Sequence, residues 1–264
     1  MIIQVPHKKE LDPTNIKQDN KKQDNKKQNN IKKISIVLAV HNESENIPQV
    51  MNSIKRAVQI IRDRYIVEII AVNDGSTDRS LYMLDRERRD NPFLTVIDHP
   101  FKKGMTAVVT SAMERASGEI LIFSPADMES HPDEDIPKLL GVLEKGYDVA
   151  AGMRVGRKDG KSTSSMIGNK IISTCFKLRL HDINWIKAMT REAADTMVLK
   201  HGWVRYMLLF PHFHGMKISE VETNWYQRTY GKSKFGTMRL IESLKDLLIL
   251  TFCYLKGDFS RKIL

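Results

Sequence analysis

Continuous apolar runs alternate with segments of helical periodicity through the first two thirds of the chain. Four segments space their apolar residues as an amphipathic helix does, namely 43–63, 78–89, 106–116 and 133–144. They separate five aliphatic runs that predict buried strands: ISIVLAV (34–40), IVEIIAV (66–72), LTVID (94–98), EILIF (119–123) and DVAAG (148–152). Strands that alternate with helices predict an α/β fold, in which helices flank a mixed, mostly parallel sheet.

Three of the predicted strands end in polar clusters, HNES (41–44), NDGSTD (73–78) and SPADMESHPDED (124–135). Ligands bind such a sheet at the carboxyl ends of its strands. In the second cluster Gly75 permits a tight turn, and Thr77 or Asp78 is suited to capping the next helix. Capping does not account for Asp74, which precedes the turn and is suited to accept hydrogen bonds from a base imide or a ribose hydroxyl.

The third cluster divides into two groups of acids. Asp127 and Glu129 are two residues apart, so in extended chain both side chains project to one side. Two hard oxygen donors on one side suit Mg²⁺ or Mn²⁺ bound together with substrate phosphates. The remaining acids, residues 133–135, follow Pro132 and are predicted to lie in the first turn of a helix, where the helix dipole favours them.

Composition adds a basic tail to this picture. The 264 residues suit one large domain with appendages, and the formal net charge of +10 favours an anionic partner. The first 33 residues contain nine lysines and four acids, and residues 1–30 are polar and of low complexity, which predicts a disordered tail. That tail either binds an anionic surface or is merely solvated. Nucleic acid is disfavoured as a partner, because aromatic residues are not interleaved with the basic ones.

The compartment is predicted to be the cytoplasm. Two cysteines, Cys175 and Cys253, do not suggest a disulfide framework. The opening residues lack an apolar stretch as long as that of a secretory signal.

Five segments occur in the order typical of one enzyme family: VHNESENI, VNDGSTDRS, HPFKKGMTAVVTSAMERASGEILIFSPADMESHP, GMRVGRKDG and NWYQRTYGKSKFG. From about Ile34 to Phe235 the chain resembles the family-two inverting glycosyltransferases, which implies the nucleotide-sugar-binding GT-A fold over residues 31–236. The last two segments resemble the branch that contains dolichyl-phosphate mannose synthases and bacterial polyprenyl-phosphate sugar transferases.

The resemblance implies roles on the donor side of the site. Asn42 and Glu43 stand in the first nucleotide-binding loop, with Glu43 near the ribose or base, and Asp74 faces the nucleoside. Asp127 matches the second acid of the family's Asp-x-Asp metal motif, and Glu129 stands where relatives place a polar metal ligand. The implied ligands are a UDP- or GDP-linked sugar and Mg²⁺ or Mn²⁺.

The resemblance also implies roles for basic residues. Arg154, Arg157 and Arg228 fall where relatives hold phosphates, and Lys234 belongs to a loop that is expected to close over the substrates. Asp127, Arg154 and Arg228 are the residues to which catalysis is assigned.

Pro125 departs from the family pattern, because it occupies the position of the motif's first acid and offers neither a carboxylate nor a backbone N–H. Either Glu129 compensates, or the donor site is weakened and the protein binds nucleotide sugars without effective catalysis. A second departure lies at residues 183–193, INWIKAMTREA, where Trp185 is either a platform for a sugar or a core residue.

The charges on the acceptor side favour a phosphate acceptor. A hydroxyl acceptor needs a general base, whereas a phosphate arrives ionised and needs positive charge around it. The acceptor-side motifs supply six basic residues: Arg154, Arg157, Lys158, Arg228, Lys232 and Lys234. Asp159 and Asp182 are the nearest acids. A polyprenyl phosphate is therefore the expected acceptor. The alternative is a glycan hydroxyl, for which a base near Asp182 would be the support.

Residues 237–264 predict an amphipathic helix. A stripe of apolar residues occupies positions 240, 241, 244, 247, 248, 252 and 255. The uninterrupted apolar part is too short to cross a bilayer, which takes ~20 residues. The helix is expected either to lie in the membrane interface or to pack on the catalytic domain or in an oligomer contact. With the basic tail, it predicts a peripheral protein at the inner face of the membrane, in contact with anionic lipid.

Overall fold

One mixed sheet organises the chain. The computed structural model describes residues 31–156, 170, 172–200, 202–231 and 237–257, and the predicted tail lies outside them. Within these residues the strands follow the order β3-β2-β1-β4-β6-β5-β7. Neighbours are parallel except that β6 runs antiparallel to β4 and to β5. The strands are β1 Lys32–Val40, β2 Tyr65–Asp74, β3 Leu94–His99, β4 Ile120–Pro125, β5 Val149–Val155, β6 Lys187–Thr190 and β7 Ile218–Asn224.

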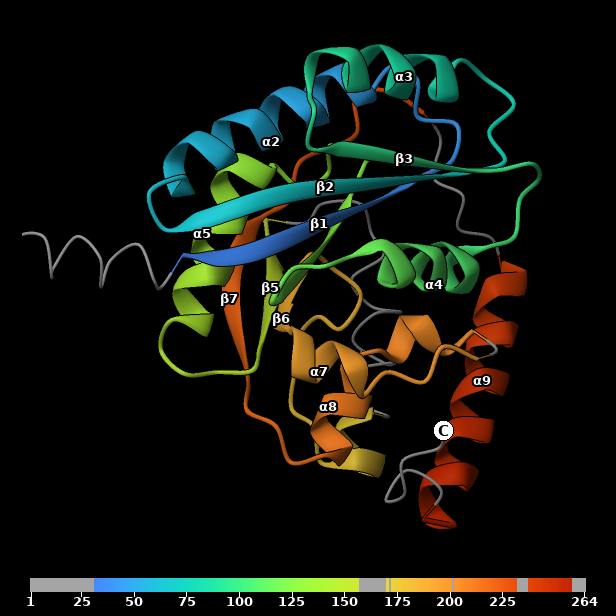
Figure 1. The fold of residues 1–264 in the computed structure, drawn as a ribbon. Coiled ribbons are helices and arrows are strands. Elements are labelled where there is room, and N and C mark those ends of the chain that lie inside the picture. The colour runs from blue at the N-terminus through green and yellow to red at the C-terminus, as the bar shows by residue number, and fades with distance from the viewer. Residues whose placement is uncertain (1–30, 157–169, 171, 201, 232–236, 258–264) are drawn as a thin grey trace, which may run out of the picture.

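Helices cover both faces of this sheet (Figure 1). One face carries α2 Ile47–Ile61, α3 Ser80–Asp90 and α5 Pro132–Leu143. The other face carries α4 Met105–Arg115, α7 Arg191–Asp195, the 3₁₀ helix η1 Trp203–Tyr206, α8 Leu209–Phe213 and α9 Thr237–Leu255. The prediction of an α/β fold with a mixed, mostly parallel sheet is confirmed.

Alternation along β1 explains why this strand lies at the centre. Ile34, Ile36 and Leu38 pack with α2 and α5, whereas Val37 packs with α4 on the opposite face. All four side chains are buried, as expected of a strand that is covered on both sides. The five predicted strands and four predicted helices are each present, with ends shifted by a few residues at most. Strands β6 and β7 were not predicted.

The parallel strands bring their carboxyl ends to one edge of the sheet. The loops after β1, β2, β3, β4, β5 and β7 therefore start at this edge. Because β6 is antiparallel, its first residue, Lys187, and the preceding segment 182–186 reach the same edge. The polar clusters of the sequence thus converge, although they are far apart along the chain.

Helix α9 divides its apolar residues between two directions. Leu247 and Leu250 are buried against the domain, and the ring of Tyr254 stacks on Phe213 with centroids 4.4 Å apart. Leu248 and Phe252 are 64% and 58% exposed. The expectation of one common stripe was therefore wrong for positions 247 and 248, because Leu247 is buried whereas Leu248 is exposed. The side chains at 240, 241 and 244 lie outside the described set.

None of the helices in the described ranges is both long enough and apolar enough to span a membrane.

Candidate functional site

The loop after β1 is fastened to the loop after β2. The backbone N–H of Asn42 donates to Ser76 Oγ at 3.0 Å, and Asn42 Oδ1 accepts the backbone N–H of Thr77 at 2.8 Å. Asn42 adopts a left-handed φ of 52°, which asparagine tolerates better than most residues. Asn42 therefore positions the two loops, and the nucleotide contact implied by the family resemblance stays a prediction.

Glu43 lies next to Asn42 and is buried. Its carboxylate accepts a 2.7 Å hydrogen bond from Asn46 Nδ2, and its backbone N–H donates to Ser80 Oγ at 2.8 Å. The N-cap of α3 is Arg79 and not Thr77 or Asp78, but Asp78 Oδ1 accepts the N–H of Ser80 at the start of the helix, 2.9 Å away. Its other oxygen accepts the N–H of Ser44.

Asp74 ends β2 and organises the loop after β3. Its carboxylate accepts the backbone N–H groups of Lys103 and Gly104 at 2.8 and 2.9 Å, and His99 Nδ1 lies 3.1 Å from Oδ1. Burial acts to raise the pKa of Asp74, but these hydrogen bonds outweigh it, and the pKa is lowered. Asp74 is therefore ionised and holds this loop, and its predicted contact with a nucleoside stays a prediction.

Gly75 allows the loop after β3 to pass close to the backbone at the end of β2. Its φ is +59°, and an added Cβ would lie 2.3 Å from the backbone nitrogen of Lys102. A side chain at this position would push the loop away from Asp74.

Asp127, Glu129 and Arg228 come together where β4 ends. Arg228 Nε donates to Glu129 Oε1 at 2.6 Å, and Arg228 Nη2 donates to Asp127 Oδ2. The N–H of Glu129 donates to Asp127 Oδ1 at 3.2 Å, and Met128 between them has a left-handed φ of 57°. A single guanidinium contacts both carboxylates, as two side chains on one side would allow, but the extended chain assumed in the prediction is wrong here, because the backbone turns at Met128.

Burial shapes the charges of this triad. The three side chains are between 14% and 19% exposed. Burial raises the pKa of Asp127 to about 6, and the nearby Arg228 opposes this shift without cancelling it. Burial would lower the pKa of Arg228, but Asp127 and Glu129 raise it.

The end of β4 supplies two side-chain ligands for a divalent cation. In the described part of the chain, no three His, Cys, Asp or Glu side chains cluster as metal ligands. Asp127 and Glu129 nevertheless present two hard oxygen donors from one loop. This set fits Mg²⁺ or Mn²⁺, which take one or two carboxylates and complete their shell with phosphate and water. Pro125, the last residue of β4, adds no donor side chain.

Arg154 and Asp182 form a second ion pair at the same edge. Arg154 Nε and Nη2 donate to the two Asp182 oxygens at 2.5 and 2.9 Å, and the side chains are 10% and 8% exposed. The Arg154 guanidinium also lies 4.6 Å from the centroid of the Trp185 indole. Arg154 is thus committed to a carboxylate, and its predicted contact with phosphate stays a prediction.

Trp185 belongs to the core. It is buried, and its Nε1 donates to Thr223 Oγ1 at 2.9 Å. Of the two readings of Trp185, the sugar platform is wrong, because the indole is covered by its neighbours and held by this hydrogen bond.

Lys187 was missed by the sequence analysis. Its ammonium group is buried at the start of β6 and donates to the carbonyl of Ile183 at 2.9 Å. Burial lowers the pKa of Lys187 to about 8, while Asp182 raises it and Arg154 lowers it further. His99 was missed as well. A strand-terminal histidine is the signal that could have found it, whereas Lys187 stands in an apolar segment without a motif.

Four of the predicted basic residues, Arg157, Lys158, Lys232 and Lys234, lie outside the described residues.

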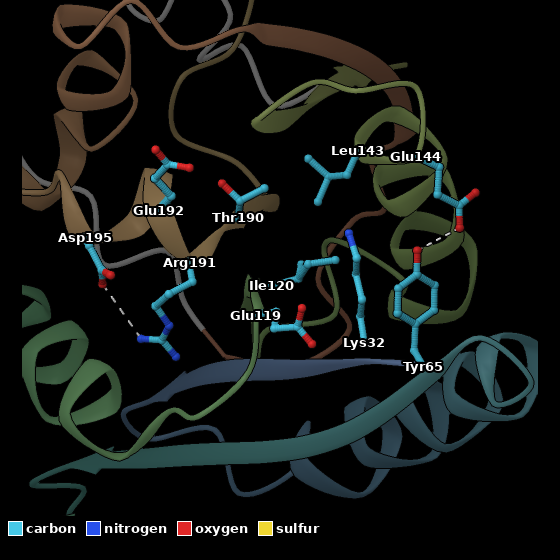
Figure 2. Close-up of a pocket in the computed structure, with 10 residues that line it drawn as sticks. All are labelled: Lys32, Tyr65, Glu119, Ile120, Leu143, Glu144, Thr190, Arg191, Glu192 and Asp195. Atoms are coloured by element: carbon cyan, nitrogen blue, oxygen red, sulfur yellow. Dashed lines mark hydrogen bonds and ion pairs between the residues drawn. The ribbon is translucent and has the colours of Figure 1, made fainter. Parts of the chain in front are cut away.

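A cavity of about 520 Å³ lies at the opposite edge of the sheet (Figure 2). Lys32, Tyr65 and Ile120 line it at or near the first residues of β1, β2 and β4, and Thr190 lines it at the end of the antiparallel β6. The Tyr65 hydroxyl donates to Glu144 at 2.7 Å on one side of it. Because it lies at the amino-terminal edge, this cavity is separate from the converging polar clusters.

Solved structures of glycosyltransferases share this fold. Glucosyl-3-phosphoglycerate synthase from Mycobacterium tuberculosis, solved with Mn²⁺, UDP and glucosyl-3-phosphoglycerate, superposes with a TM-score of 0.63 at 18% identity, over 84% of this chain and 79% of that one. A mannosyltransferase from Pyrobaculum calidifontis, solved with GDP-Man and Mn²⁺, superposes with a TM-score of 0.57 at 14% identity, over 76% and 59% of the two chains. The chain therefore has the GT-A fold of glycosyltransferases.

Sequence comparison then gives the family. Residues 35–198 match the model of glycosyl transferase family 2, so the chain belongs to that family and is a glycosyltransferase. It is 29% identical over 221 residues to the undecaprenyl-phosphate 4-deoxy-4-formamido-L-arabinose transferases of Yersinia pestis (strain Pestoides F) and Yersinia pseudotuberculosis serotype O:3 (strain YPIII). Those matches cover 82% of this chain and 67% of each relative.

Proposed function

We propose that this glycosyltransferase moves a sugar from a UDP- or GDP-linked donor to a polyprenyl phosphate, with inversion at the anomeric carbon. The names of the Yersinia relatives support the acceptor, and the ligands of the solved GT-A structures support the donor. The observation that carries the choice of acceptor is the ion pair between Arg154 and Asp182.

Asp182 is poorly placed to act as a general base. Both of its oxygens accept hydrogen bonds from one guanidinium, and its side chain is almost fully buried. A sugar hydroxyl must lose its proton during attack, which requires a base within hydrogen-bond reach. A phosphate acceptor needs no such base, because it is already anionic. The pairing of Asp182 therefore favours the polyprenyl phosphate over a glycan hydroxyl.

The proposed reaction is a direct displacement. An oxygen of the acceptor phosphate forms a bond to the anomeric carbon, the bond from that carbon to the donor diphosphate breaks, and the nucleoside diphosphate leaves with the electron pair. Asp127 and Glu129 would hold Mg²⁺ or Mn²⁺, which, when bound, supplies positive charge to the leaving diphosphate. Arg228 adds a planar fork of donors that suits phosphate oxygens.

The convergence of Asp127 and Glu129 also bears on the reading of a weakened donor site. Pro125 removes one acid from the motif, but Glu129 brings a second carboxylate to the same guanidinium as Asp127. Two carboxylates together with the donor diphosphate match the coordination that Mg²⁺ requires. This arrangement supports compensation by Glu129 and hence an active transferase.

We place the protein at the cytoplasmic face of the membrane as a peripheral protein. Leu248, Phe252 and Leu255 are exposed on α9 at spacings of four and three residues, which puts them on one face of the helix. Lys256 lies 4.4 Å from the Phe252 ring centroid, and Lys245 is exposed nearby on the helix. An apolar face flanked by lysines is suited to an anionic membrane interface. The lysines of the tail would add electrostatic attraction.

Product analysis tests the proposal. The full chain is incubated with Mn²⁺, undecaprenyl phosphate and a panel of UDP- and GDP-sugars, and the lipid products are identified by mass spectrometry. The expected result is a glycosylated lipid phosphate together with free UDP or GDP. Nucleotide binding without any product, or transfer to a glycan hydroxyl alone, would overturn the proposal.

A further inference from the structure

Arg228 lies between the two carboxylates to which the metal is assigned. Its Nε and Nη2 reach Glu129 Oε1 and Asp127 Oδ2, so one edge of the guanidinium bridges two side chains. The three groups are largely withdrawn from solvent, where an ion pair is weakly screened. The bridging position is also where a cation shared by both carboxylates would lie.

We propose that Arg228 is the resident counter-cation of the Asp127–Glu129 pair, and that it competes with the divalent cation for these two carboxylates. The inference rests on the proposed function, because it takes the metal and the nucleotide from there. A guanidinium and a divalent cation carry like charge, so both cannot bridge the same oxygens. Even a cation bound to the other oxygens of Asp127 and Glu129 would lie beside the guanidinium and be repelled by it.

The segment that carries Arg228 is fixed by contacts that do not involve its side chain. The N–H of Tyr226 donates to the carbonyl of Glu129 at 2.9 Å, and the Tyr226 ring stacks on His131 with centroids 3.8 Å apart. The Tyr226 hydroxyl donates to Glu134 at 2.8 Å. Arg228 can therefore release the carboxylates by rotation of its own side chain while the chain at residue 226 stays in place.

The diphosphate of the donor provides the partner to which a released Arg228 can turn. Arginine binds phosphate oxygens through two parallel hydrogen bonds, much as it now binds the two carboxylates. The metal then gains Asp127 and Glu129 at the moment when Arg228 gains the diphosphate. Metal and nucleotide should therefore bind cooperatively, and each should tighten the other by the same factor.

Direct measurement of Mn²⁺ binding without nucleotide tests the competition. Electron paramagnetic resonance titration of the full chain gives the Kd of Mn²⁺ for wild type and for Arg228→Met. We expect the substitution to tighten Mn²⁺ at least about tenfold, which corresponds to ~1.4 kcal/mol. Arg56→Met is the matched control, because Arg56 pairs with Asp133 at 2.7 Å on the α2–α5 surface and does not contact the triad. The control should leave the Kd unchanged.

A second arm measures the coupling. Saturating UDP or GDP should tighten Mn²⁺ binding in both proteins, because the diphosphate also completes the metal's shell, but by a larger factor in wild type than in Arg228→Met. Arg228→Lys keeps a charge but cannot bridge both carboxylates with a fork, so its Kd should lie between the other two. Melting temperatures of all variants verify that each is folded. If Arg228→Met is not folded, the comparison of wild type with Arg228→Lys tests the competition instead.

Three results would overturn the inference, and they separate it from the proposed function. If folded Arg228→Met binds Mn²⁺ no more tightly than wild type does, while wild type transfers sugar to undecaprenyl phosphate, the proposed competition is refuted and the proposed function stands. The competition is likewise refuted if nucleotide tightens Mn²⁺ binding by the same factor in wild type and in Arg228→Met. Absence of Mn²⁺ binding to either protein, with transfer that persists in EDTA, removes both the competition and the metal site.

Discussion

Replacement of Asp182 by Asn tests the reading of this residue as a buried counterion. The substitution keeps the shape of the side chain and removes its charge, which leaves Arg154 buried with a neutral partner. Lys187 stands close enough for its charge to be felt there as well. Removing one partner of a buried ion pair costs about 3–5 kcal/mol, because the remaining charge is desolvated and uncompensated. For a domain of this size, that loss lowers the melting temperature by roughly 6–20 °C.

The assay is urea and thermal denaturation at pH 7. Asp195→Asn is the matched control, because Asp195 is 60% exposed and lies 4.0 Å from Arg191 Nη1, and such surface pairs contribute at most about 1 kcal/mol. The double variant Arg154→Met with Asp182→Asn should regain part of the stability, since neither charge of the pair is then left alone. A variant Asp182→Asn as stable as wild type, yet inactive in transfer, would refute the reasoning and point to Asp182 as a reacting base.

Three further perturbations address the metal site, the buried lysine and the exposed helix face. Asp127→Asn should reduce transfer at least ~100-fold at an unchanged fold, as circular dichroism and product assays can show; wild-type turnover would exclude Asp127 as a metal ligand. The pKa of Lys187 is lowered to about 8, so between pH 8 and 10.5 the unfolded chain binds more protons than the folded one. As the pH rises through that interval, the free energy of unfolding of wild type should increase by ~3 kcal/mol relative to that of Lys187→Met. Parallel curves of stability against pH for the two proteins would argue against a buried ammonium group. The double variant Leu248→Ser with Phe252→Ser should release the protein from anionic liposomes without lowering its melting temperature. Leu250→Ser, which alters a buried residue of the same helix, should lower the melting temperature by several degrees. Co-sedimentation of the double variant with liposomes would exclude this face as the membrane contact.

The periodic elements of the fold could be predicted because each is encoded locally. The run 34–40 alternates between two buried faces, and its β-branched residues favour a strand whatever its partners are. Strand β6 could not be found in this way, because it has four residues and owes its position to pairing with β4 and β5. The stripe on α9 was misread for a related reason. A helical period reports which residues share a face, but not whether that face meets the domain or the solvent.

The candidate site was predictable in its residue types and only partly in its contacts. Asp127 and Glu129 could be assigned together because both follow β4 within one short loop, although the turn at Met128, and not extended chain, sets their relative direction. Their contact with Arg228, about a hundred residues later, depends on β4 and β7 ending at the same edge. Arg154 looked available for phosphate, since nothing in the sequence shows that Asp182 lies opposite it across β5 and β6. These ion pairs depend on which strands lie side by side in the sheet, and no single segment of the sequence shows that.

A comparison of two acceptors with the same lipid chain tests whether the acceptor is a phosphate. The full chain is supplied with Mn²⁺, the donor sugar that it uses, and either undecaprenyl phosphate or undecaprenol. The rate of sugar transfer to each is measured by mass spectrometry under identical conditions. We expect transfer to the phosphate and none to the alcohol. Transfer to the alcohol at a comparable rate would contradict this, because an alcohol acceptor requires a general base and Asp182 is held in an ion pair with Arg154.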